Sequence, residues 1–169
     1  PFRGHKTQLY EGGIRSPLIA WGPGIVKQHG HVDRDSVFAA IDLVPTLLTL
    51  TETPLELNVV YDGEPLVATI LGEGGSRQAP LMFRRPPDRD TFYGVADLPD
   101  LAIRAGKWKL LCEYDGSQAE LYDLATDAGE KHDVSRDHSA IVQELTEQVL
   151  AWHRSLPPDA GEDYREAAE

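Results

Sequence analysis

The pattern of apolar positions changes partway along the chain. Up to about residue 71, apolar residues occur in short continuous runs such as Leu18–Trp21, which Pro17 and a Gly-Pro-Gly sequence bound. A short apolar run between turn residues is typical of a buried strand. From residue 79 onward, apolar and polar positions alternate as in a strand that buries one face. We therefore predict a domain that covers residues 1–75, a smaller one that covers 76–158, and an acidic tail from 159 to 169.

The first part is predicted to contribute strands and a helix to an α/β domain. We expect strands at Leu18–Trp21 and at residues 36–41. A helix should follow, with Asp42 as its N-cap and Pro45 in its first turn, where the backbone N–H has no intrahelical partner. The apolar face of this helix would consist of Leu43, Leu47, Leu48 and Leu50.

The second part is predicted to form a small antiparallel sheet. We expect a strand at 81–83, a hairpin over 101–114 that turns at Ala105 and Gly106, and a strand at 120–124. Strict alternation in the hairpin separates two sets of side chains. The core-facing set is Trp108, Leu110, Cys112 and Tyr114, and the solvent-facing set is Lys107, Lys109 and Glu113.

Helical spacing of apolar residues over 141–156 predicts one amphipathic helix after the sheet. Asp137 or Ser139 is its expected cap, and the Pro157-Pro158 pair ends it. Together these elements predict an α/β fold that ends in a small antiparallel sheet packed with a C-terminal helix.

Composition and charge exclude several functions. The net charge of −12 argues against a nucleic-acid partner, and no apolar run approaches the length of a membrane span. The single cysteine, Cys112, lies in the alternating strand pattern and is expected to serve packing. A single cysteine does not decide whether the protein is exported, periplasmic or cytoplasmic. Because the chain begins with Pro1 rather than Met, we expect it to be part of a longer protein.

Candidate chemistry is concentrated in the segment from Gly4 to Pro17. Lys6 is followed by a polar loop with two adjacent glycines, and a lysine held there is a compact charge suited to an oxyanion. An isolated exposed lysine is more often simply solvated. Glu11 and Arg15 are expected to pair with each other or with backbone. His29 and His31 lack further ligands at metal-binding spacing, so we expect a solvated loop.

This segment resembles the lysine-bearing motif of the sulfatase family. That motif is Lys, three variable residues, Tyr-Glu-Gly-Gly, an apolar residue, Arg, one residue and Pro. The matching residues here are Lys6, Tyr10, Glu11, Gly12, Gly13, Arg15 and Pro17. The resemblance implies the C-terminal part of an alkaline-phosphatase-like fold. It also implies that Lys6 contacts the sulfate ester, with Tyr10, Glu11, Gly12, Gly13 and Arg15 supporting the loop.

Three further segments resemble the family. They are Asp42-x-x-Pro45-Thr-Leu-Leu, Asp62-Gly63-x-x-Leu66, and the stretch from Glu120 to Leu124. The resemblance implies a formylglycine nucleophile and a divalent metal, usually calcium, in the whole enzyme. The Cys/Ser-x-Pro-x-Arg motif of that nucleophile is absent from this sequence, as are the family's metal-binding aspartates. We therefore expect this chain alone to be inactive.

Two alternatives to a sulfatase stay open. One is a phosphodiesterase or phosphonate monoester hydrolase of the same superfamily, and the other is a non-catalytic interaction module. The expected substrate is a small-molecule or glycan sulfate ester. Arg84, Arg85 and Tyr93 could border the substrate pocket or lie solvated on the surface. With apolar strands left uncovered, the chain alone is expected to self-associate.

Overall fold

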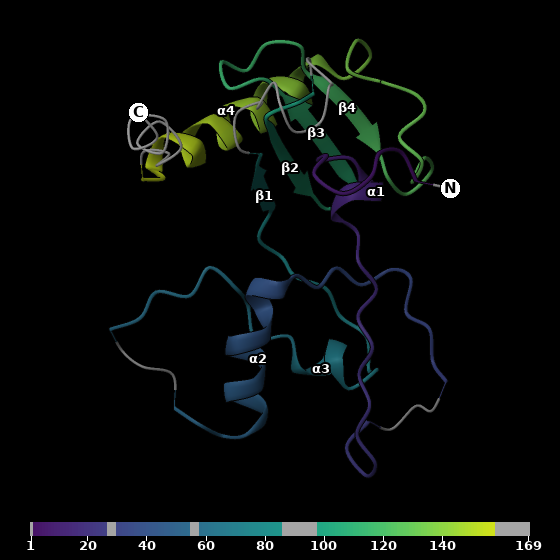
Figure 1. The fold of residues 1–169 in the computed structure, drawn as a ribbon, viewed down its shortest axis with the longest axis vertical. Coiled ribbons are helices and arrows are strands. Elements are labelled where there is room, and N and C mark those ends of the chain that lie inside the picture. The colour runs from purple at the N-terminus through teal and green to yellow at the C-terminus, as the bar shows by residue number, and fades with distance from the viewer. Residues whose placement is uncertain (1, 27–29, 55–57, 86–97, 158–169) are drawn as a thin grey trace, which may run out of the picture. The chain divides into compact units, whose positions relative to one another are not determined.

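The structure is a computed structural model and describes residues 2–26, 30–54, 58–85 and 98–157. The chain divides into two compact units. One unit combines Pro1–Ser16 with Pro80–Glu169, and the other is Pro17–Ala79 (Figure 1). The predicted boundary at residue 75 stays a prediction, but the first sixteen residues group with the C-terminal sheet rather than with their neighbours in sequence. The predicted acidic tail lies outside the described residues.

The C-terminal unit is built on a four-stranded antiparallel meander in the order β1-β2-β3-β4. Its strands are β1 (Leu81–Arg84), β2 (Leu101–Ala105), β3 (Trp108–Cys112) and β4 (Glu120–Asp123). A tight turn at Gly106, whose φ is +57°, joins β2 to β3. The predicted strands and hairpin are confirmed, because period-two alternation and glycine turns specify both pairing and register.

Helix α4 (Ser139–Ser155) covers one face of this sheet. Its Leu145 and Val149 are buried in a core with Leu101, Ile103, Leu110, Cys112 and Leu121. Burial raises the pKa of the Cys112 thiol to about 12, in keeping with a packing role. The predicted helix is confirmed, but the predicted cap is wrong. His138 occupies the N-cap position, and no side chain caps the helix.

The opposite face of the sheet is covered by the N-terminal segment, which includes the one-turn helix α1 (Glu11–Ile14). Leu9 and Tyr10 pack there in a second core, formed with Ala102, Leu111, Tyr122 and Leu124. Both faces of the sheet are therefore buried. The alternation in β3 separates two cores rather than core from solvent.

Lys109 shows the consequence, since it is 0% exposed where the sequence predicted a solvent-facing lysine. Its ammonium lies 3.1 Å from a carboxylate oxygen of Glu11 and 2.7 Å from one of Glu130. The backbone N–H of Glu11 donates to the other oxygen of Glu130 at 2.6 Å. These three side chains, here called the buried triad, attach the N-terminal segment to the sheet.

The charges around the buried triad do not cancel within it, because two carboxylates face one ammonium. Arg15 and Arg104 approach the second oxygen of Glu11 at 3.7 and 4.0 Å and supply further positive charge. Burial raises the pKa of Glu130, and the ammonium of Lys109 opposes that shift. The predicted pairing of Glu11 with Arg15 is present, but Lys109 is the nearer partner.

The second unit, Pro17–Ala79, is held together by a polar centre at Asp42. It contains the 3-10 turn η1 (Ala40–Asp42) and helices α2 (Leu43–Leu50) and α3 (Val67–Ile70). The Asp42 carboxylate accepts a 2.5 Å hydrogen bond from Arg77 and bonds from the backbone N–H of Ala39 and Glu64. Asp42 occupies the N-cap position of α2, as predicted, but its carboxylate joins these three segments and makes no capping hydrogen bond to the helix. Pro45 lies in the first turn, as predicted.

A close backbone contact explains the Asp62-Gly63 pair in this unit. A Cβ added to Gly63 would lie 2.0 Å from the carbonyl oxygen of Ile41. Only glycine allows these two backbones to meet.

The two strands predicted in this unit, Leu18–Trp21 and 36–41, are wrong. Neither segment forms a strand, and the second one leads into the 3-10 turn η1. Ile19 is 87% exposed and Trp21 is 84% exposed. A strand needs a neighbour for its backbone hydrogen bonds, and none forms among the described residues of 17–79. None of the helices in the described part of the chain has the length and hydrophobicity that crossing a bilayer requires.

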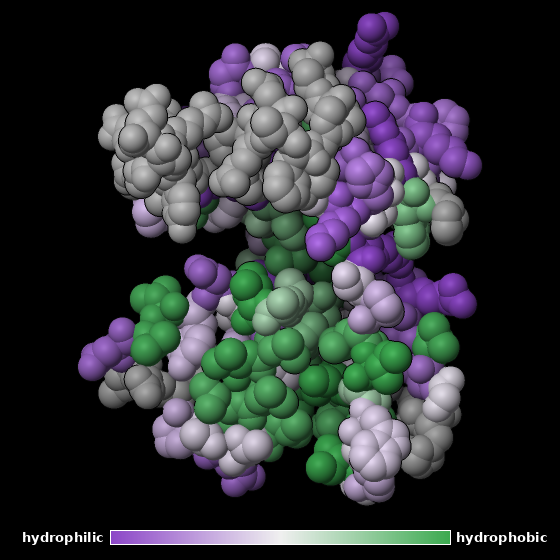
Figure 2. All heavy atoms as spheres, viewed as in Figure 1, coloured by the Kyte–Doolittle hydropathy of each residue, from purple (hydrophilic) through white to green (hydrophobic). Residues whose placement is uncertain are grey.

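Exposed apolar side chains gather on the second unit, as Figure 2 shows over α2 and α3. We expect the isolated chain to self-associate through them, because such surfaces are unfavourable in water. Light scattering should then give at least twice the monomer mass of 18.7 kDa. The double substitution Ile19→Glu with Val60→Glu should restore the monomer.

A matched control places two charges on exposed α4 positions, as Ala140→Glu with Ala151→Glu, and should leave the assembly intact. A wild-type chain that stays monomeric at high concentration would contradict this expectation.

The buried triad yields a stability prediction. Lys109→Met should lower the free energy of unfolding by about 3–5 kcal/mol, because it leaves two buried carboxylates without their ammonium. Lys107→Met is the matched control two residues earlier, since Lys107 is half exposed and pairs with Asp123 at the surface. That control should cost less than about 1 kcal/mol. Urea unfolding followed by circular dichroism measures both, and equal midpoints would show that the triad contributes nothing.

Candidate functional site

Lys6 lies at the tip of a four-residue turn. The backbone N–H of Gln8 donates to the carbonyl of His5 at 3.0 Å and closes the turn. Thr7 has a φ of +83°, whereas Lys6 has a negative φ. This combination is that of a type II turn, whose third position usually holds glycine. A β-branched residue there is strained by about 1–3 kcal/mol.

The side chains of His5 and Gln8 hold the turn in this conformation. The Gln8 side-chain oxygen accepts from the backbone N–H of His5 at 3.3 Å. The His5 Nδ1 lies 3.0 Å from the carbonyl oxygen of Lys6, and because a carbonyl only accepts, Nδ1 carries the proton. Nε2 of His5 then accepts from the Gln8 amide at 3.4 Å. These bonds close a small network around the Lys6 peptide.

The paired glycines of the motif allow the backbone of the turn to pack directly against α1. A Cβ on Gly12 would lie 2.4 Å from the carbonyl oxygen of Gly4, and one on Gly13 would lie 2.0 Å from that of Gln8. Any larger residue would therefore push the Lys6 turn away from α1. In addition, the backbone N–H of Gly12 donates to the carbonyl of Arg3 at 2.7 Å.

Tyr10 fixes the same segment to β4. Its hydroxyl donates to Glu120 at 2.9 Å, and the Tyr122 hydroxyl donates to the same carboxylate oxygen at 2.8 Å. The Arg3 guanidinium lies 3.9 Å from the centre of the Tyr10 ring and donates to the Tyr122 hydroxyl at 2.6 Å. Burial, followed by the charge of Glu120, raises the pKa of Tyr10, so its phenol stays protonated. Two motifs of the sequence analysis thus meet in one hydrogen-bonded cluster.

Lys6 differs from the other charged residues of its motif. Glu11 is buried with Lys109, and Arg15 lies beside Glu11 with its guanidinium 4.7 Å from the Phe2 ring centre. Lys6 is exposed, and its ammonium has no hydrogen-bond or ion-pair partner among the residues that the structure describes. The segment therefore presents one available cation on a rigid turn.

The other candidate residues do not join Lys6. Arg85 is buried, donates to the carbonyls of Leu98 and Pro99 and pairs with Asp100, so it is not solvated on the surface. Its role at the border of a substrate pocket stays a prediction. Arg84 is half-buried in β1. Tyr93 and His29 lie outside the described residues, and His31 is exposed in a loop.

The described residues do not fit the metal and nucleophile that the family resemblance implies. Within the described ranges, no group of three His, Cys, Asp or Glu side chains could hold a metal ion. Cys112, the single cysteine of the sequence, is buried in the core against α4. What this chain offers chemically is therefore electrostatic: a positive charge, held in place, that can bind an oxyanion.

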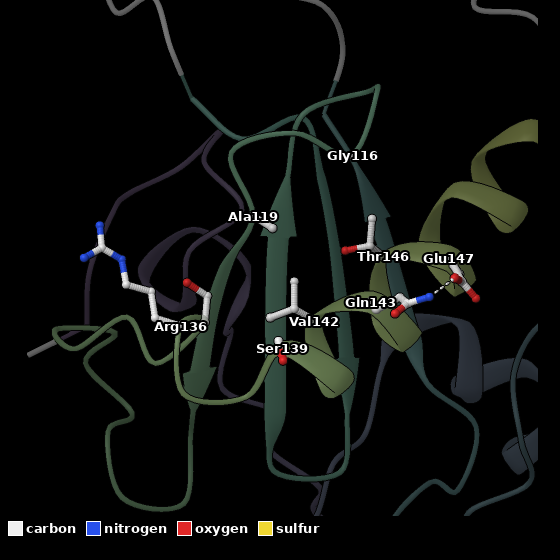
Figure 3. A pocket seen from close by; sticks show the side chains of 9 residues that line it. Gly116, Ala119, Arg136, Ser139, Val142, Gln143, Thr146 and Glu147 are labelled. Atoms are coloured by element: carbon white, nitrogen blue, oxygen red, sulfur yellow. Dashed lines mark hydrogen bonds between the residues drawn. The ribbon is translucent and has the colours of Figure 1, made fainter.

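A separate shallow pocket of about 430 Å³ lies beside α4 (Figure 3). Ala119, Val142 and Thr146 line it, with Arg136 and Glu147 at its charged margins. It belongs to the α4 side of the sheet, whereas Leu9 and Tyr10 pack on the other side. Lys6 is not among its lining residues, so this pocket is separate from the candidate site.

Sequence reasoning missed the residues that hold Lys6. Lys109 and Glu130 lie about a hundred residues away, Gln8 falls at a variable position of the motif, and His5 lies just before the motif. One signal was available for Lys109, since Leu111 shares its strand face and indicated that this face is also buried.

No family model matches the chain. It is nevertheless similar to curated sulfatases. It is 28% identical to arylsulfatase K of Mus musculus over 149 residues, which cover 86% of this chain and 26% of that protein. It is 28% identical over 160 residues to N-acetylgalactosamine-6-O-sulfatase of Bacteroides thetaiotaomicron. That match covers 86% of this chain and 29% of that protein. It is 32% identical over 151 residues to arylsulfatase A of Homo sapiens. That match covers 76% of this chain and 28% of that protein. The chain thus spans between a quarter and a third of these relatives.

Solved structures agree with the sequence comparison. One comes from a study of the metabolism of multiple glycosaminoglycans by Bacteroides thetaiotaomicron. It matches 89% of this chain and 31% of its own with a TM-score of 0.69 and 26% identity. Ps i-CgsB in complex with k-i-k-neocarrahexaose matches 66% of this chain and 23% of its own, with a TM-score of 0.51 and 28% identity. The antiparallel sheet and the C-terminal helix therefore belong to a known fold, and the chain belongs to the sulfatase family, as a C-terminal portion of it.

Proposed function

We propose that this chain supplies the substrate-binding lysine of an enzyme that hydrolyses sulfate esters. The observation that carries the proposal is the contrast within the motif. Tyr10 and Glu11 are occupied by contacts with the sheet, while the ammonium of Lys6 is exposed on a clamped turn. A preformed cation of this kind stabilises charge on sulfate oxygens without having to reorganise.

We also propose a sulfated glycan as the substrate class. One relative is named N-acetylgalactosamine-6-O-sulfatase, and the related Ps i-CgsB was crystallised with k-i-k-neocarrahexaose. Both names concern sugars, which supports a carbohydrate ester over a small aryl sulfate. The turn itself contributes affinity for the anionic group rather than for the sugar.

Formylglycine and calcium belong to the proposal only as components from outside this chain. The residues that the structure describes fit neither group. The phosphodiesterase or phosphonate monoester hydrolase alternative has the same need for a lysine beside an oxyanion. The family comparisons favour the sulfatase, and the ester that is hydrolysed decides between them.

The proposal predicts a large kinetic effect at Lys6 in the complete gene product. Lys6→Ala should lower kcat/KM for a sulfate ester by a factor of about 10² to 10³, as expected for the loss of one preformed charge. Lys6→Arg should rescue poorly, because a planar guanidinium does not replace a compact ammonium. Lys131→Ala removes another exposed lysine of the same unit and should leave kinetics unchanged. Equal rates for Lys6→Ala and wild type would refute the role of Lys6.

We further expect the isolated chain to be inactive, since its sequence lacks the nucleophile motif and its described residues include no metal site. The measurement is hydrolysis of a chromogenic aryl sulfate by the purified chain with added calcium. Turnover that Lys6→Ala abolishes would overturn this expectation. Turnover that persists in Lys6→Ala would point to a contaminating enzyme.

A further inference from the structure

The residue beside Lys6 has an unfavourable backbone conformation without an evident structural reason. Thr7 occupies the third position of the type II turn with a φ of +83°. Glycine would fit that position at no steric cost, and the same segment uses glycine at Gly4, where φ is +79°. A β-branched residue in a glycine position at the tip of a candidate site suggests that its side chain has a use.

Nothing in the described structure uses that side chain. The hydroxyl of Thr7 has no hydrogen-bond partner among the described residues, and neither does its backbone N–H. The side chain is also too exposed to be a core residue, since Thr7 is only half-buried. The neighbouring side chains of His5 and Gln8, by contrast, are occupied in holding the turn.

The turn therefore presents several donors from two adjacent residues that have no partner among the described residues. They include the Lys6 ammonium, the Thr7 hydroxyl and the Thr7 backbone N–H. A tetrahedral oxyanion has several oxygens, and it is bound best by a charge together with directed hydrogen-bond donors. A lone lysine supplies the charge but no fixed direction.

We propose that Thr7 is a second substrate-binding residue, whose hydroxyl donates a hydrogen bond to the same oxyanion that Lys6 binds. The proposal deepens the function proposed above and rests on it. It assigns the left-handed conformation of Thr7 a purpose, namely to place the hydroxyl beside the ammonium. The strain is tolerated because the His5–Gln8 network and the contacts of Gly12 and Gly13 fix the surrounding backbone.

Three substitutions in the complete gene product test this proposal. Thr7→Val keeps the β-branched shape and loses the hydroxyl, so kcat/KM for the ester should fall about ten- to a hundredfold. Thr7→Ser keeps the hydroxyl and should stay within about threefold of wild type. Thr7→Gly relieves the strain but lacks the hydroxyl. It should therefore lose activity as Thr7→Val does, while melting at or above the wild-type temperature.

Inhibition by inorganic sulfate provides a readout that a structural role would not move. Its inhibition constant should rise in Thr7→Val and Thr7→Gly and stay unchanged in Thr7→Ser. Wild-type kinetics in Thr7→Val, or equal losses in Thr7→Ser and Thr7→Val, would overturn the proposal. The Gly variant keeps the test decisive if Thr7→Val fails to fold.

The outcomes separate this proposal from the one on which it rests. If Lys6→Ala is impaired while Thr7→Val is normal, only the role of Thr7 falls. If Lys6→Ala is normal, the proposed function fails and the role of Thr7 fails with it. If the gene product hydrolyses a phosphate ester instead, the same three variants are compared with that ester and inorganic phosphate. A loss in Thr7→Val would then support oxyanion binding without a sulfatase.

Discussion

A fully buried ammonium group must have carboxylates within reach, and this requirement at Lys109 organises the C-terminal unit. Its partners come from α1 and from the loop after β4, so three segments meet at one point inside the protein. Burying such a cluster costs desolvation energy, and well-packed apolar residues in place of all three charged side chains can match its stability. What the ion pairs add is selectivity of position, because shifting the N-terminal segment by one residue would leave a charge buried alone.

The lysine-bearing motif is easier to understand with this anchor in view. Tyr10 and Glu11 bind the sheet, and Gly12 and Gly13 let the backbone of the turn lie directly against α1. Most residues of the motif therefore serve to hold the Lys6 turn in place. The position of Lys6 is set by hydrogen bonds and backbone contacts of its neighbours, which leaves its own side chain free to interact with a ligand.

The sequence predicted the meander and α4 well, because each rests on a local period. It failed at Lys109. The period-two rule correctly placed Lys109 on the face opposite the α4 core, but that face is buried and not solvated, because a segment distant in sequence covers it. It failed at Leu18–Trp21 because an apolar run becomes a strand only when another backbone pairs with it. Lys6 could be found from the motif, but the φ of Thr7 and the network of His5 and Gln8 could not, since no composition rule specifies them.

The separation in sequence between α1 and its partners has a consequence for how the protein folds. Glu11 and Lys109 are 98 positions apart, and Tyr10 and Glu120 are 110 apart. Contacts over such distances form only after a long loop has closed, whereas the meander needs just short hairpins. On a ribosome the lysine-bearing segment emerges before the sheet, yet the sheet surface on which it packs is completed only after β4 has been synthesised. We therefore expect the turn at Lys6 to take its final shape late, after the sheet whose second face it covers.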